Sequence, residues 1–91
     1  MKEYLEAVTR FANVTSVPLQ RVQTLLGNDQ VSISTVRHDR VIFLSWKEND
    51  PSWMVSFVEN NDASIEKFSS LDAAIKYIAL TIPGSGALVA F

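Results

Sequence analysis

The chain has 91 residues, no cysteine and a formal net charge of −2 at pH 7. This length suits a single domain, and a hydrophobic fraction of 47% supplies enough apolar surface to fold. The lack of cysteine excludes disulfides, cysteine-ligated zinc and thiol catalysis. The acidic balance offers no polybasic surface for nucleic acid.

The N-terminal sequence MKEYLE places acidic residues where a secretory signal needs an apolar run. No apolar stretch approaches the roughly 20 residues that a transmembrane helix needs. Small secreted domains usually carry disulfides, which this chain cannot form. We therefore expect a cytoplasmic protein without a membrane segment.

The first third of the chain has apolar residues at helical spacing. This spacing predicts one helix over residues 2–13. A second, shorter helix is expected over residues 17–26, where Ser16 and Pro18 form a start signal and Gly27 forms a stop signal.

The middle of the chain alternates with a period of two, which is typical of strands. A final helix is expected to begin after Ser70 and to end before Pro83. The strands are predicted over residues 31–36, 41–46, 53–59 and 64–68, with turns at 37–40 and 60–62 and a longer loop over 47–52.

These elements predict an α+β fold of order α-α-β-β-β-β-α. The four strands form an antiparallel meander, and the three helices pack on one face of it. Residues 1–86 are expected to form a single domain, followed by an apolar C-terminal tail over residues 87–91.

Two hairpin registers assign the strand residues to two faces of the sheet. If Trp46 pairs with Trp53 and Val36 pairs with Val41, one face becomes almost wholly apolar and must be covered by helices. We name this surface face A; its residues are Val31, Ile33, Thr35, Ile42, Leu44, Trp46, Trp53, Val55 and Phe57. The opposite surface, face B, is expected to contain Val36, Val41, Phe43, Met54 and Val58 among Ser32, Ser34, Ser45, Ser56 and Glu66.

Face B is more apolar than the solvent-facing side of an antiparallel sheet usually is. A contiguous apolar patch of this kind is typical of an interface. The expected partner is a second copy of the chain, giving a homodimer, or else another protein. A cover formed by the C-terminal tail is the alternative explanation. The predicted interface residues are Val36, Val41, Phe43, Met54 and Val58.

Residues that could support catalysis or hold a metal are scarce. His38 is the only histidine and is expected in a turn, without a second histidine or a cysteine to complete a metal site. Glu48 and Asp50 share one loop, and Glu59 and Asp62 flank another, as solvated carboxylates do. We therefore expect no enzyme, no cofactor and no metal.

The apolar spacing over residues 10–26 resembles a helix-turn-helix. This resemblance implies an alternative function, a winged-helix-like DNA-binding regulator with the 37–40 hairpin tip as its wing. Ser16 stands where the turn glycine is commonest, and Arg21 is the only cation of the second helix, so little phosphate neutralisation is available. The alternative requires the arginines of this half of the chain to converge on one surface. Its nucleic-acid residues are Gln20, Arg21, Gln23, Arg37 and Arg40.

The stretch from Phe68-Ser69-Ser70 through the last helix to Ile82-Pro83-Gly84-Ser85-Gly86 is similar to a segment of small type I-F anti-CRISPR proteins of phages. The spacing differs, and short α+β proteins share this order of strand, cap and helix, so we assign no family. The resemblance implies an accessory protein of a mobile element that acts by binding. The expected function is therefore a small, non-catalytic, protein-binding accessory protein that forms a homodimer.

Overall fold

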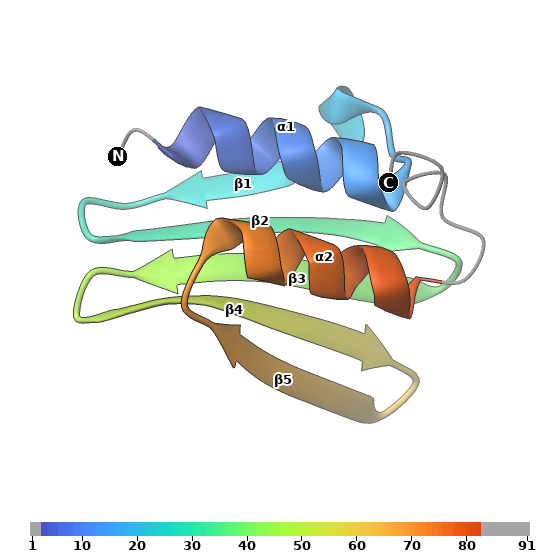
Figure 1. The fold of residues 1–91 in the computed structure, drawn as a ribbon. Helices are drawn as coiled ribbons and strands as arrows, with labels where there is room; N and C mark the ends of the chain where they lie inside the picture. Colours follow the sequence, from blue (N-terminus) through green and yellow to red (C-terminus); the bar gives the residue numbers. More distant parts are fainter. Residues whose placement is uncertain (1–2, 83–91) are drawn as a thin grey trace.

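A computed structural model describes residues 3–82, in which two helices lie side by side across one face of an antiparallel sheet (Figure 1). The strands follow one another through the sheet in chain order. The fold is α+β, and the predicted tail over residues 87–91 lies outside the described residues. The elements are α1 (Glu3–Thr15), η1 (Leu19–Arg21), β1 (Gln23–Leu26), β2 (Gln30–Arg37), β3 (Arg40–Lys47), β4 (Asp50–Glu59), β5 (Asp62–Phe68) and α2 (Leu71–Thr81).

Tight turns join the strands of the meander. His38 and Asp39, with φ of 53° and 63°, form the two-residue connection between β2 and β3. Positive φ at both positions suits a hairpin, because it matches the twist of the flanking strands. The loop expected over residues 47–52 is shorter than predicted, since the strands extend to Lys47 and resume at Asp50 with a register shift between Trp46 and Lys47.

Both predicted hairpin registers are confirmed. Trp46 lies opposite Trp53, and Val36 lies opposite Val41. Leu44 consequently lies between Ile33 and Val55, its partners on the two neighbouring strands. Because side chains alternate along a strand, these pairs fix which residues point to face A.

The predicted helix over residues 17–26 is wrong. This segment forms η1, a single 3-10 turn, and then β1, which pairs with β2 so that Leu26 lies opposite Val31. Helical spacing is a weak preference that tertiary context overrides: pairing as a strand satisfies the backbone groups along the outer edge of β2. The sheet therefore has five strands and is covered by two α-helices, instead of the predicted four strands and three helices.

The core lies between face A and the two helices. Phe11 of α1 and Ile78 of α2 are fully buried, as are Ile33, Ile42 and Leu44 of the sheet. Thr35 is also buried on this face, and its hydroxyl donates to the carbonyl of Arg21 at 3.3 Å. Covering face A in this way confirms its assignment as the core.

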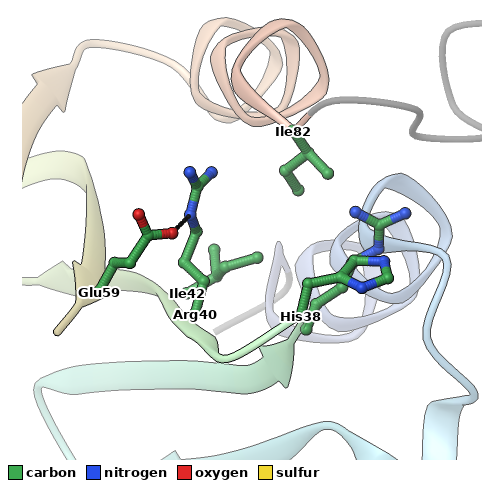
Figure 2. Close-up of a pocket in the computed structure, with 6 residues that line it drawn as sticks. His38, Arg40, Ile42, Glu59 and Ile82 are labelled. Carbon is green, nitrogen blue, oxygen red and sulfur yellow. Dashed lines mark hydrogen bonds and ion pairs between the residues drawn. The ribbon is translucent and has the colours of Figure 1, made fainter.

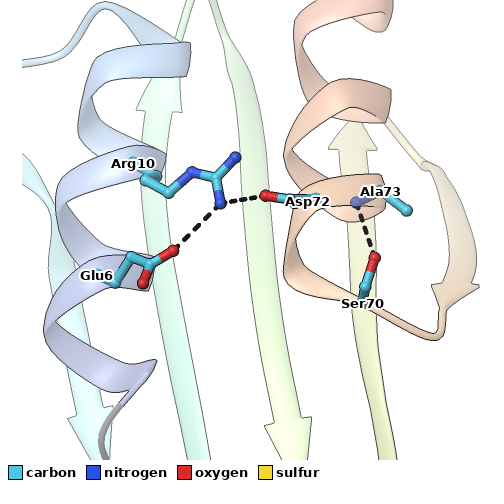
Figure 3. Close-up of polar contacts among 5 residues, drawn as sticks. All are labelled: Glu6, Arg10, Ser70, Asp72 and Ala73. Carbon is cyan, nitrogen blue, oxygen red and sulfur yellow. Dashed lines mark hydrogen bonds and ion pairs between the residues drawn. The ribbon is translucent and has the colours of Figure 1, made fainter.

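A side-chain contact joins the middle of α1 to the first turn of α2 (Figure 3). Arg10 of α1 donates to Glu6 on its own helix and to Asp72 on α2. The hydrogen bond to Asp72 is the main reason that the pKa of Arg10 lies above its ordinary value. Ser70 caps α2, since its hydroxyl accepts a hydrogen bond from the Ala73 amide at 3.2 Å.

Candidate functional site

Face B is the side of the sheet on which neither α1 nor α2 packs. Its side chains alternate with the buried residues of face A, so the five predicted interface residues all point to this surface. Val41, Phe43, Met54 and Val58 are half-buried, and Val36 is 64% exposed. The structure thus brings the five residues together on one surface, over β2, β3 and β4.

Phe43 lies near the centre of face B and is surrounded by small side chains. Ser34 on β2 and Ser56 on β4 are its cross-strand partners, and Ser45 is the next residue of β3 that points the same way. Phe43 is half-buried, and it forms one wall of a hollow that Ser34, Val36 and Val41 also line.

The predicted position of Glu66 on face B is wrong. Glu66 lies opposite Val55, a residue of face A, while Ile65 lies opposite Ser56 on face B. The pairing of Glu59 with Asp62 across the turn decides which face each residue of β5 points to, and the two predicted registers do not include this turn. Ile65 is 62% exposed, so this correction makes face B more apolar.

The first strand adds a further apolar residue to face B. Leu25 of β1 lies opposite Ser32 and is 67% exposed. Because a helix was predicted over residues 17–26, Leu25 is absent from the predicted residues of face B. Only the pairing of β1 with β2 shows that Gln23 and Leu25 point to face B, while Thr24 points to the opposite face.

Two charged side chains of face B pair at the end formed by the β3–β4 hairpin. Lys67 of β5 donates to Asp50 of β4 across a distance of 2.7 Å between Nζ and Oδ2. This hydrogen bond holds the pKa of Asp50 below its ordinary value, and Lys47 adds a smaller effect of the same sign. Face B consequently has an apolar centre and a charged edge, the arrangement of many protein interfaces.

The residues of the nucleic-acid alternative are divided between two places. Gln20, Arg21 and Gln23 line a hollow of about 610 Å³ beside Phe43, where β1 begins and η1 turns away from the sheet. Arg37 and Arg40 point to the face A side of the β2–β3 hairpin.

The helix-turn-helix is not formed, because its second helix is η1 followed by β1. Within residues 3–82, no helix follows α1 in the position where a recognition helix would enter the major groove. The cations do not converge either: Arg10 bridges the two helices, whereas Arg21 lies at the hollow beside Phe43. The described residues therefore do not form the helix-turn-helix or the shared cationic surface that the winged-helix-like alternative requires.

A second pocket opens at the β2–β3 hairpin, on the side of the helices (Figure 2). Its volume is about 260 Å³. Arg40 donates from Nε to Glu59 at 3.1 Å, and its guanidinium carbon lies 5.5 Å from the centre of the Phe57 ring. We name this space the hairpin pocket; it is lined by Arg37, His38, Arg40, Ile42, Glu59 and Ile82.

His38 does not meet the loop carboxylates that an enzyme would need. It precedes β3, whereas Glu48 and Asp50 follow β3, so they lie at opposite ends of that strand. Across residues 3–82, no group of three histidine or carboxylate side chains is close enough to hold a metal ion.

Comparison with protein-family models, curated proteins and solved structures finds no match to this chain. Neither described helix combines the length and hydropathy that crossing a membrane requires. Arguments about function therefore rest on the surfaces described above.

Proposed function

We propose that this protein acts by binding another protein chain through face B, and that this chain is a second copy of itself. The observation that supports the proposal is the composition of face B, an apolar centre with the Lys67–Asp50 pair at one end and Arg21 at the hollow beside Phe43. An apolar patch of a few hundred Å² is often functional. Phenylalanine and methionine are also enriched at the centres of interfaces.

The shape of face B favours a second copy of this chain as the partner. Phe43 is bulky, while Ser34, Ser45 and Ser56 beside it are small. In a two-fold dimer each surface meets its own image, so every projection needs a recess on the same face. The Phe43 ring of each copy can lie over the serines of the other copy, which satisfies this condition.

The size of face B suffices for a modest interface. Five strands about 4.8 Å apart span roughly 20 Å, and three residues of one face span roughly 14 Å along a strand. The flat area is thus roughly 280 Å², so with side-chain relief each copy would bury on the order of 300–500 Å², or on the order of 600–1,000 Å² in total. This area is at the lower limit for a specific interface, so we expect a dimer of moderate affinity.

Substitution of Phe43 by glutamate tests the proposal. In a dimer the carboxylate would be buried without a partner, whereas in a monomer it stays solvated. Leu80→Glu is the matched control, because Leu80 is 77% exposed on α2, on the other side of the molecule. Sedimentation velocity over a range of protein concentrations measures the association, and circular dichroism checks the fold.

We expect the natural chain and Leu80→Glu to sediment as dimers at high concentration and Phe43→Glu to sediment as a folded monomer. A monomeric natural chain would refute the proposal. If Phe43→Glu unfolds, face B belongs to the core of the single chain, and the proposal fails for that reason instead.

A further inference from the structure

The two edges of the sheet differ in length. β1 forms one edge and has four residues, whereas β5 forms the other and has seven (Figure 1). β5 contains no proline, and its pairing with β4 has no register shift. Natural sheets protect a long edge with proline, a bulge, a covering segment or charge, because its backbone groups can pair with another chain. Residues 62–67 are all exposed, so charge is the only one of these devices on β5 in the described chain.

Three residues of β5 direct their backbone groups outwards. A two-residue turn connects β4 to β5 and is closed by Glu59 opposite Asp62. The closing pair of such a turn exchanges hydrogen bonds, and bonded and non-bonded pairs then alternate along the ladder. The N–H and C=O groups of Ala63, Ile65 and Lys67 therefore point away from β4. Within residues 3–82 these groups have no backbone partner, so they are available to a further strand.

The charges along β5 are divided between its two sides. Asp62 and Glu66 are exposed on the face A side, and neither forms an ion pair with Lys76 of α2 or with any other described cation. Lys67 points to face B, where an aspartate of β4 balances it. The face A side of this edge consequently has two unpaired carboxylates.

A hollow of about 230 Å³ lies between the start of β5 and α2. Tyr77 and Thr81 of α2, both half-buried, line it together with Asp62. Arg40 and Glu59 also line it and pair with each other, so they leave the charge of Asp62 unbalanced. The stem of a lysine on a neighbouring strand can lie against the Tyr77 ring while its ammonium group reaches Asp62.

A second copy of this chain does not suit this edge. Antiparallel pairing of two β5 strands keeps face A of both copies on the same side of the joined sheet. Asp62 and Glu66 of both copies would then place four unpaired carboxylates on that side. Because like charges on neighbouring strands destabilise a sheet, the edge favours a strand with cations at the matching positions.

We propose that the outer edge of β5 binds an extended basic segment of another protein as an additional strand of the sheet. The segment runs antiparallel to β5, since antiparallel pairing is the more stable kind. Cationic side chains lie opposite Asp62 and Glu66, and an apolar side chain lies opposite Ile65, which is 62% exposed. Main-chain hydrogen bonds supply affinity and the side chains supply selectivity. These bonds lie in the plane of the sheet rather than on face B, so the inference does not depend on the dimer.

The probe is the acetylated and amidated peptide Lys-Val-Thr-Val-Lys, whose residues pair in that order with Glu66 back to Asp62. Two-dimensional NMR of the full chain measures binding, and we expect a dissociation constant on the order of 1 mM. The amides of Ala63 and Ile65 should shift most, because they gain hydrogen bonds from the two valines. The amides of β1 should not shift.

Methylation of backbone nitrogens separates hydrogen bonding from charge. In the bound peptide both valine N–H groups point to β5, whereas the threonine N–H points away from it. Methylation of both valine nitrogens should abolish measurable binding, and methylation of the threonine nitrogen is the matched control that should preserve it. The peptide Glu-Val-Thr-Val-Glu should bind at least tenfold more weakly, because attraction becomes repulsion.

The double variant Asp62→Asn with Glu66→Gln removes both carboxylates without changing the size of either side chain. It should weaken binding of the lysine peptide by about three- to tenfold, the effect of losing two exposed ion pairs. Asp29→Asn is the control, because Asp29 is an exposed acid in the turn between β1 and β2, at the other edge of the sheet. It should leave the dissociation constant unchanged.

Four results would overturn the inference. Equal binding of the lysine and glutamate peptides would remove the role of the carboxylates. Binding that survives methylation of both valines, or shifts that map to β1 or face B, would show that no strand is added at β5. No shift at millimolar peptide concentrations would remove the binding site. Shifts of the β5 amides with protein concentration alone would identify a second copy as the occupant of the edge.

Discussion

Leu44 and Phe43 are neighbours on β3 that point to opposite faces of the sheet, and they test which face is the core. Leu44 is 0% exposed and lies between Ile33 and Val55, whereas Phe43 is half-buried among serines. Leu44→Ala removes three methyl or methylene-sized groups from a site that cannot collapse easily, because strands fix it on both sides. The expected loss in the free energy of unfolding is about 2–5 kcal/mol.

This loss is large for a chain of this length, whose total stability is expected to lie around 5–14 kcal/mol. Urea denaturation followed by circular dichroism measures it, and the dependence on urea should stay the same if the unfolded state does not change. The control is Phe43→Ala, which removes more atoms but from face B. Both variants should be measured at concentrations where the midpoint does not depend on protein concentration, so that association makes no contribution.

We expect Leu44→Ala to be the more destabilising variant, although its deletion is the smaller one. The reasoning would be refuted by a loss below about 1 kcal/mol for Leu44→Ala, which is the range of surface substitutions and small truncations. It would equally be refuted if Phe43→Ala cost more, because face B would then be the better-buried side of the sheet.

Two further predictions concern polar contacts. Ser70→Ala should lower the free energy of unfolding by about 1 kcal/mol, because the Ala73 amide loses its cap. In the same urea assay Ser69→Ala, an exposed neighbour, should change little, and equal losses would disprove a cap-specific effect. Lys67→Met should raise the pKa of Asp50 toward its ordinary value, since Lys67 is the main cause of its depression. A depressed folded pKa means that the contribution of Asp50 to stability is present above the unfolded pKa and is lost as pH falls through the folded pKa. NMR titration of the Asp50 carboxyl carbon checks this, and an unchanged pKa would contradict the assigned cause.

Local sequence is sufficient to predict the pairing of β2 with β3 and the face to which each of their residues points. The alternation of Val41 to Trp46 separates two faces, and a two-residue turn at His38 and Asp39 fixes the pairing of Val36 with Val41. Because the side-chain period of a strand is two, one correct pair determines the face of every residue in the hairpin. Together with the pairing of Trp46 with Trp53, this rule places the five predicted residues of face B without knowledge of the tertiary structure.

The segment over residues 17–26 could not be decided in this way. Its apolar residues suit a short helix, yet the same residues also suit an extended edge strand. The outer edge of β2 is created only when the rest of the sheet forms, and only then does pairing satisfy more backbone groups than an isolated helix would. The addition of Leu25 to face B depended on this choice.

The sequence by itself determined the alternation within β2, β3 and β4 and the pairs Val36–Val41 and Trp46–Trp53, because these follow from contacts between near neighbours in the chain. Tertiary structure alone decided the identity of β1 and the assembly of the hairpin pocket. Arg40, Glu59 and Ile82 come from β3, from β4 and from the residue that follows α2. No local pattern links them, because their proximity results from the pairing of β3 with β4 and the packing of α2 on face A.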